Sequence, residues 1–170
     1  MTTRRIAFRL ETRWTPARDG EPPLYELTLH NLGPDPASGF ALCVSGPARI
    51  DAAATIEGGT VVRRLSNHTE LAPPADFVLE PGQTWELQVR SLSHPLRHWS
   101  DGVNGAYVVL ADGRLLDVAT APAALAGSDA PLLTGTARFE LPEHFSETVS
   151  IIPWPKRVEI SGARITPAGL

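Results

Sequence analysis

The stretch between residues 76 and 90 alternates apolar and polar side chains in the pattern of a half-buried β-strand. In its second half every other residue is apolar, and successive side chains of a strand leave opposite faces of the backbone. Pro81-Gly82 precedes that half and is typical of a tight turn, because proline presets φ and glycine tolerates a positive φ. We therefore predict a hairpin whose apolar residues share one interior layer, namely Phe77, Leu79, Trp85, Leu87 and Val89.

The same alternation recurs in short segments along the chain, with turn residues roughly every 8–12 positions. Apolar residues at helical spacing are missing, and Asp112-Gly113 between two apolar runs is a further hairpin signal. The pattern predicts an all-β fold, an antiparallel immunoglobulin-like or cellulose-binding-like β-sandwich with an extended C-terminal tail. Its strands are expected to include residues 6–14, 25–30, 40–44, 107–110 and 114–118.

The composition changes along the chain and predicts three regions. Residues 3–120 hold the strand patterns and are expected to form the sandwich. Residues 121–150 are rich in Ala, Pro and Gly, which is typical of a linker or of a tail packed on the sandwich. Residues 151–170 are expected to begin another domain, a small α/β domain. Four residues of the last two regions are expected to pack between domains: Phe145, Pro153, Trp154 and Pro155.

Charge, hydropathy and cysteine content indicate which partners, location and disulfides to expect. The net charge of −4 and the pI near 5.7 argue against nucleic acid and against an anionic membrane. No apolar run approaches the roughly 18–20 residues of a transmembrane helix, and the N-terminus lacks the apolar stretch of a secretion signal. These features predict a cytoplasmic location. Cys43 is the single cysteine, so it cannot form an intrachain disulfide, and we expect it to be a small buried residue.

The segment around Trp99 is the candidate binding site. Sugar sites combine an aromatic ring, which packs on the apolar face of a pyranose, with polar groups that bond to the hydroxyls. This segment joins one indole to several such groups, which are Arg97, His98, Trp99, Asp101 and Asn104. The alternative interpretation is that Trp99 covers one open end of the sandwich while its polar neighbours stay in solvent.

Two short patterns suggest metal binding only superficially. His94 and His98 have the spacing of zinc ligands on a helix, but Pro95 disfavours a helix there and no third ligand is evident. Residues 101–105 offer two oxygen ligands, whereas calcium takes six to eight. We therefore expect no metal and no cofactor.

Six positions between Tyr25 and Val89 follow a recurring order: a tyrosine-led strand, an asparagine turn, a loop ending in proline, an apolar strand and Pro-Gly. They are Tyr25, Asn31, Pro73, Phe77, Pro81 and Gly82. In this order they resemble the N-terminal β-sandwich of bacterial family-20 β-N-acetylhexosaminidases and chitobiases. Residues 151–155 with Val158 are similar to the entry into the small α/β domain that precedes the catalytic barrel of that family.

The resemblance implies a parent glycoside hydrolase that removes terminal N-acetylhexosamine residues with an Asp-Glu pair on a (β/α)₈ barrel. There the Glu protonates the glycosidic oxygen, and the acetamido group of the substrate, oriented by the Asp, attacks the anomeric carbon. Such a barrel needs roughly 200–250 residues, and no adjacent Asp-Glu occurs in these 170 residues. We therefore expect no catalytic residue and no glycosidase activity in this chain alone.

The implied role is that of a non-catalytic accessory domain, with the catalytic domains of the parent as its partners in cis. Such a domain would brace those domains and could also contact glycans that contain N-acetylglucosamine. The alternative is a purely structural or protein-interaction β-sandwich that binds no sugar.

Overall fold

The computed structural model describes residues 7–128 and 130–132, which belong to a unit that spans Met1–Thr136. Apart from one short 3-10 helix, the regular structure of these residues is β-strand, which confirms the predicted all-β class. The strands are β1 (Phe8–Thr15), β2 (Leu24–Asn31), β3 (Ala37–Ser38), β4 (Ala41–Ser45), β5 (Ile50–Glu57), β6 (Thr60–Leu65), β7 (His68–Ala72), β8 (Val78–Leu79), β9 (Thr84–Leu92), β10 (Gly105–Val109), β11 (Leu115–Thr120) and β12 (Ala124–Leu125).

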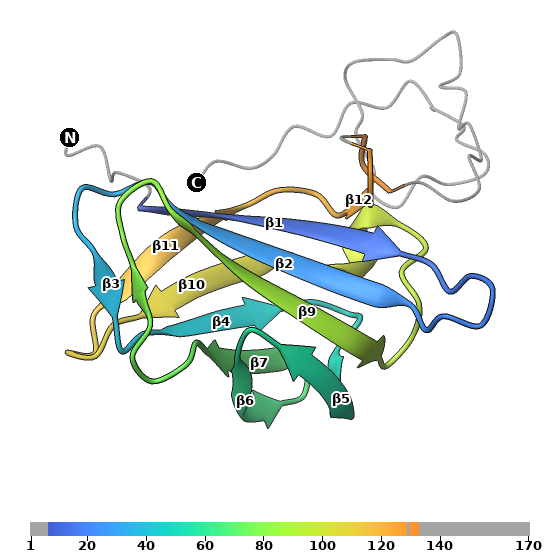
Figure 1. Cartoon of the computed structure of the whole chain (residues 1–170), viewed down its shortest axis with the longest axis horizontal. Helices are drawn as coiled ribbons and strands as arrows, with labels where there is room; N and C mark the ends of the chain where they lie inside the picture. The colour runs from blue at the N-terminus through green and yellow to red at the C-terminus, as the bar shows by residue number, and fades with distance from the viewer. Residues whose placement is uncertain (1–6, 129, 133–170) are drawn as a thin grey trace, which may run out of the picture. The chain divides into compact units, whose positions relative to one another are not determined.

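Most strands belong to one curled sheet with the order β5-β9-β2-β1-β11-β10-β4-β7-β6 (Figure 1). Strands β5, β9, β2 and β1 form one layer, and β11, β10, β4, β7 and β6 form the other. Strand β1 joins the layers, because it pairs with β2 on one side and with β11 on the other. The pairs β1–β11 and β1–β12 are parallel, so the sheet is mixed rather than wholly antiparallel. These partners lie about a hundred residues apart in sequence, where alternation within a strand gives no information about direction.

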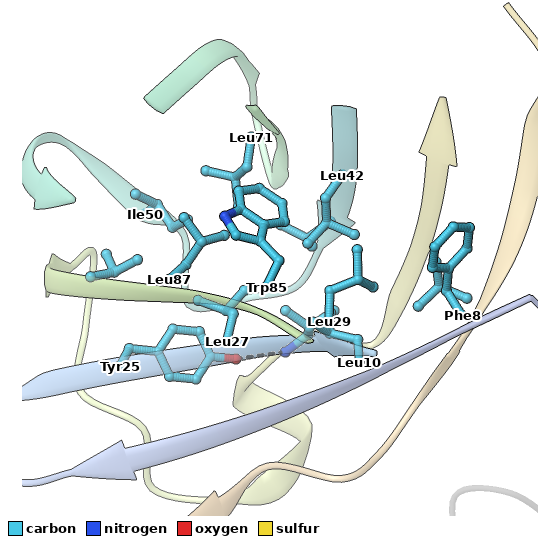
Figure 2. Packing of buried hydrophobic residues seen from close by; sticks show 14 of the residues in the cluster. Phe8, Leu10, Tyr25, Leu27, Leu29, Leu42, Ile50, Leu71, Trp85 and Leu87 are labelled. Carbon is cyan, nitrogen blue, oxygen red and sulfur yellow. Dashed lines mark hydrogen bonds between the residues drawn. The ribbon is translucent and has the colours of Figure 1, made fainter. Parts of the chain in front are cut away.

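The core lies between the two layers (Figure 2). The predicted facing of β9 is confirmed, because Trp85, Leu87 and Val89 are buried while Thr84 and Glu86 are exposed. In the other layer, too, alternate strand residues face the core. Burying one aliphatic side chain stabilises the fold by roughly 1.5–3 kcal/mol. The fully buried side chains of that layer include Leu42, Leu71 and Val108.

The predicted hairpin at residues 76–90 is wrong in its pairing, although its turn is present. The Gln83 amide donates to the Glu80 carbonyl at 3.0 Å across Pro81-Gly82. Strand β8 pairs with β3, however, whereas β9 pairs with β2 and β5. Leu79 nevertheless points into the core, and the Phe77 ring lies 6.3 Å from that of Trp85, as expected of one apolar layer.

The side chain of Asn31 fixes the turn that follows β2. It is 1% exposed, and its Nδ2 donates to the carbonyls of Asp35 at 2.9 Å and Leu79 at 3.0 Å. Its Oδ1 accepts from the Gly33 amide at 3.0 Å. These bonds hold β8 against the end of β2. Breaking any one of them would leave a buried polar group without a partner, which is costly.

After β11 the chain stays on the sheet. Strand β12 pairs with β1, and Ala123 and Leu132 are buried. Four predicted interdomain residues lie outside the described residues, namely Phe145, Pro153, Trp154 and Pro155, and so does the predicted region 151–170. In the part of the chain that the structure describes, no helix has the length and apolarity needed to cross a membrane.

Candidate functional site

The loop between β9 and β10 contains all five residues of the predicted glycan site. It includes the 3-10 helix η1 (Trp99–Asp101). Leu96 before the helix and Val103 after it are buried in the core, so the loop is anchored at both ends. The Trp99 amide also donates to the Leu132 carbonyl at 2.8 Å, which ties the helix to the segment that follows β12.

A reciprocal cap begins η1. His98 is the N-cap residue, and its Nδ1 accepts from the Ser100 amide at 3.2 Å. Asp101 Oδ2 accepts from the amides of Arg97 at 2.9 Å and His98 at 3.0 Å. Partial burial alone would raise the pKa of Asp101, but these two amides and the nearby histidines outweigh it and hold the pKa below its ordinary value of 3.8. The carboxylate thus satisfies backbone donors that a helix start leaves free.

Replacing Asp101 with asparagine should lower the free energy of unfolding at pH 7 by about 0.5–1 kcal/mol, because an amide oxygen accepts more weakly than a carboxylate and the site is partly exposed. The pKa of Asp101 is lower in the folded protein than in the unfolded chain. The extra stability that the carboxylate gives over an amide is therefore fully present at pH values above the unfolded pKa, about 3.9. It is lost as the pH falls through the folded pKa. Urea midpoints of wild type and Asp101→Asn should therefore converge in acid. A gap that widens on acidification would contradict this role.

The second half of the loop rests on Tyr25, a role that its strand pattern did not reveal. The Val103 amide donates to the Tyr25 hydroxyl at 3.2 Å, which ties the loop to β2, 78 residues earlier in the sequence. Burial raises the pKa of Tyr25 above 10.0, so the hydroxyl stays neutral. A Cβ at Gly102 would lie 2.9 Å from Ala123 Cβ and 3.1 Å from the Tyr25 hydroxyl. The loop is therefore tightly packed on its inner side.

His98, Asp101 and Asn104 each use one side-chain polar atom for a hydrogen bond within the loop. Asn104 Nδ2 donates to the Ser100 carbonyl at 3.0 Å, and His98 Nδ1 lies 2.8 Å from Ser100 Oγ. Trp99 differs, since its side chain is 41% exposed and its ring centroid lies 5.2 Å from that of His98. The structure brings the five predicted residues together around η1, with the indole as a half-exposed surface.

A hollow lies beside the start of this loop. It is lined by residues from the ends of β1 and β9 and from the segment before β2, including Trp14, Pro22, Pro23, Arg90, His94 and Pro95. An indole, an arginine and a histidine are residue types that sugar sites use. Trp14, however, is 4% exposed and packs edge-on to Tyr25 at 6.4 Å. Its ring face is therefore not open to a pyranose, and sequence could not identify the hollow because three segments build it.

A polar cluster on the outer face of the second layer was not predicted. Cys43 on β4 lies opposite Glu70 on β7 and opposite Tyr107 on β10. His68 is two residues before Glu70 and so shares its face, and the ligand atoms of Cys43, His68 and Glu70 lie within 4.8 Å of one another. Burial raises the pKa of the Cys43 thiol, and contact with that thiol raises the pKa of Tyr107. The alternation His68-x-Glu70 was the available signal, but the pairing of β4 with β7 was needed to read it.

No family model matches the chain, and no curated protein matches it. Among solved structures, it is similar to the GH20 exo-β-N-acetylglucosaminidase from Vibrio harveyi in complex with N-acetylglucosamine. That match has a TM-score of 0.60 and 22% identity, and it covers 74% of this chain and 19% of the enzyme. An inactive mutant of the same enzyme gives the same TM-score and identity, with 20% of that chain covered. This chain thus spans about one fifth of the length of these structures.

A GH18 chitinase from Chromobacterium violaceum also matches, with a TM-score of 0.48 and 17% identity over 72% of this chain and 21% of the chitinase. A match at that score adds nothing to the assignment. The likeness to the Vibrio harveyi enzyme, at 22% identity, concerns the fold. The chain shares the all-β, sandwich-like fold of one region of that enzyme.

Proposed function

We propose that this chain is a non-catalytic accessory domain of a β-N-acetylhexosaminidase and that it braces the catalytic domains of its parent. The observation that carries the proposal is the fold likeness to about one fifth of the Vibrio harveyi exo-β-N-acetylglucosaminidase. The family-20 motifs at Tyr25, Asn31 and Pro81-Gly82 point the same way. The described residues contain strands and one 3-10 helix, without the alternating strands and helices of a (β/α)₈ barrel. The activity would therefore belong to other domains of the parent.

The loop around η1 supports bracing rather than sugar binding. Three of its polar side chains form hydrogen bonds with the backbone or side chains of their own loop, namely His98, Asp101 and Asn104. These bonds orient the three side chains toward their own loop, whereas a sugar site presents polar groups that are preorganised toward the ligand. The half-exposed Trp99 then serves as a cover on the sandwich or as a contact for a neighbouring domain.

Strand β6 supports the same role. It lies at one end of the sheet order, so one of its backbone edges has no strand partner among the described residues. Val61, Val62 and Leu65 are all exposed on it. Exposed apolar residues on an edge strand favour association, and in the proposed function the catalytic domains of the parent cover this edge.

The reading frame that encodes this chain tests the parentage. We expect it to encode also a (β/α)₈ barrel with adjacent Asp and Glu at the carboxyl end of a strand, because the proposed reaction needs both groups. A complete reading frame without such a barrel would overturn the proposed parentage.

Titration with chitobiose and longer chito-oligosaccharides tests bracing against sugar contact. A single exposed sugar contact would bind at about millimolar Kd, so amide and indole NMR shifts should be followed to tens of millimolar ligand. We expect no saturable shift at Trp99. Saturable shifts centred on its indole that disappear in Trp99→Ala, with the rest of the spectrum intact, would instead assign this loop to glycan binding.

A further inference from the structure

The outer face of β4, β7 and β10 brings together three side chains that are good metal ligands. Strand pairing places Cys43 directly opposite Glu70, and Ser45 directly opposite His68. Residues two apart on a strand share a face, so the thiol, the imidazole and the carboxylate all lie on the side away from the core. None of these three residues belongs to the loop around η1, which contains the predicted glycan site.

The separations suit a single ion. The ligand atoms of Cys43, His68 and Glu70 are mutually within 4.8 Å, and His68 Nε2 lies 3.5 Å from Glu70 Oε1. A tetrahedral zinc ion with bonds of about 2.0–2.3 Å holds its ligand atoms roughly 3.3–3.8 Å apart. Small rotations of the half-buried His68 and Glu70 side chains would therefore close the set around an ion, without moving the strands.

The imidazole is already held in position. His68 Nδ1 lies 3.3 Å from Ser45 Oγ, and the His68 ring stacks on Tyr107 with centroids 6.0 Å apart and an angle of 19° between the planes. With Nδ1 engaged by the hydroxyl, Nε2 faces Glu70. Metal-binding histidines show this arrangement, in which a bond from the second ring nitrogen fixes the tautomer and the orientation.

We propose that Cys43, His68 and Glu70 bind a divalent transition-metal ion, with zinc(II) as the ion that this ligand set favours. One thiolate, one imidazole and one carboxylate match the soft and borderline ligands of zinc. Three protein ligands leave a fourth position open on the outer face. Arg63 competes for Glu70, with Nε 3.6 Å from Oε1, but its side chain is largely in solvent and can move away when an ion binds.

The competing interpretation is an ion-pair network, in which Arg63, Glu70 and His68 pair beside a buried thiol. Cobalt(II) separates the two, because a thiolate bound to cobalt gives an intense charge-transfer absorption in the near ultraviolet. The chain has one cysteine, so this band can come from Cys43 alone. We expect the band to saturate at one cobalt per chain and to be abolished by added zinc. No band in excess cobalt would overturn the proposal.

Variants identify the other ligands. His68→Gln and Glu70→Gln should each weaken cobalt binding at least about tenfold, and both residues are partly exposed, so the fold should survive. The matched control is His30→Gln, since His30 Nε2 also pairs with a carboxylate, that of Glu11 at 3.6 Å, without a nearby cysteine. We expect the control to bind cobalt like wild type. Binding unchanged in His68→Gln, or a band that persists in Cys43→Ala, would also overturn the site.

Discussion

Replacing Trp85 with alanine should lower the free energy of unfolding by about 3–5 kcal/mol, since it removes a large buried ring and leaves a cavity. The side chain is 3% exposed, and its ring lies edge-on to Phe40 with centroids 5.4 Å apart. Its Nε1 donates to the Gly58 carbonyl at 2.8 Å, so the variant also leaves that carbonyl without its partner. Urea unfolding measures the loss, from the midpoint and the slope.

Trp99→Ala is the matched control for this variant. It also removes an indole, but from a side chain that is 41% exposed and lies outside the core cluster. Its expected loss is about 1 kcal/mol or less, because less apolar surface leaves the protein interior. Similar losses for the two variants, or a loss under about 1 kcal/mol for Trp85→Ala, would mean that Trp85 does not hold the layers together.

The facing of the strands could be predicted from sequence because it is a local property. In β1, β2 and β9 the apolar residues stand at alternate positions, and Phe8, Leu27 and Leu87 are buried as the alternation requires. The hairpin at Asp112-Gly113 is local too, and β10 pairs antiparallel with β11 across it. Turn chemistry and period-two alternation act within a few residues, so sequence contains them directly.

The partners of the strands could not be predicted in the same way. The alternation around Leu79 gave its buried side correctly, but β8 pairs with the distant β3 rather than with β9. The parallel pairing of β1 with β11 depends on the whole arrangement of the layers. Alternation states which face a residue occupies and is silent about which strand lies beside it.

The same limit explains the candidate sites. The five residues around Trp99 are neighbours in sequence, so the local composition was enough to predict them as a candidate site. The hydrogen bonds of Asp101 and Asn104 within the loop could be seen only in the structure. Two strands, β5 and β6, separate Cys43 from Glu70 in sequence, and the two residues become neighbours only through the pairing of β4 with β7. Sequence analysis therefore identified the group around Trp99, whose residues are contiguous, and missed the cluster of Cys43, His68 and Glu70, which strand pairing assembles.

Replacing Gly58 with alanine should lower the free energy of unfolding by about 2–5 kcal/mol. Gly58 and Gly59 carry the chain from β5, which pairs with β9, to β6, which pairs with β7 in the other layer. Gly58 has a φ of 85°, which costs an alanine about 1–2 kcal/mol. Its added Cβ would also overlap the Glu86 carbonyl oxygen, part of the β9 backbone, and such overpacking costs roughly 1–3 kcal/mol or more.

Gly113→Ala separates these two causes. Gly113 has nearly the same φ, 81°, but a Cβ there would meet no atom within 4 Å. This control should lose only the conformational part, about 1–2 kcal/mol. Urea unfolding measures the loss of stability in each variant. The difference between the two losses is then the cost of moving the chain at Gly58 away from the β9 backbone. That separation would also strain the bond from Trp85 Nε1 to the Gly58 carbonyl. Equal losses in the two variants would show that β9 yields to the added methyl group and that the crossing does not fix the layers.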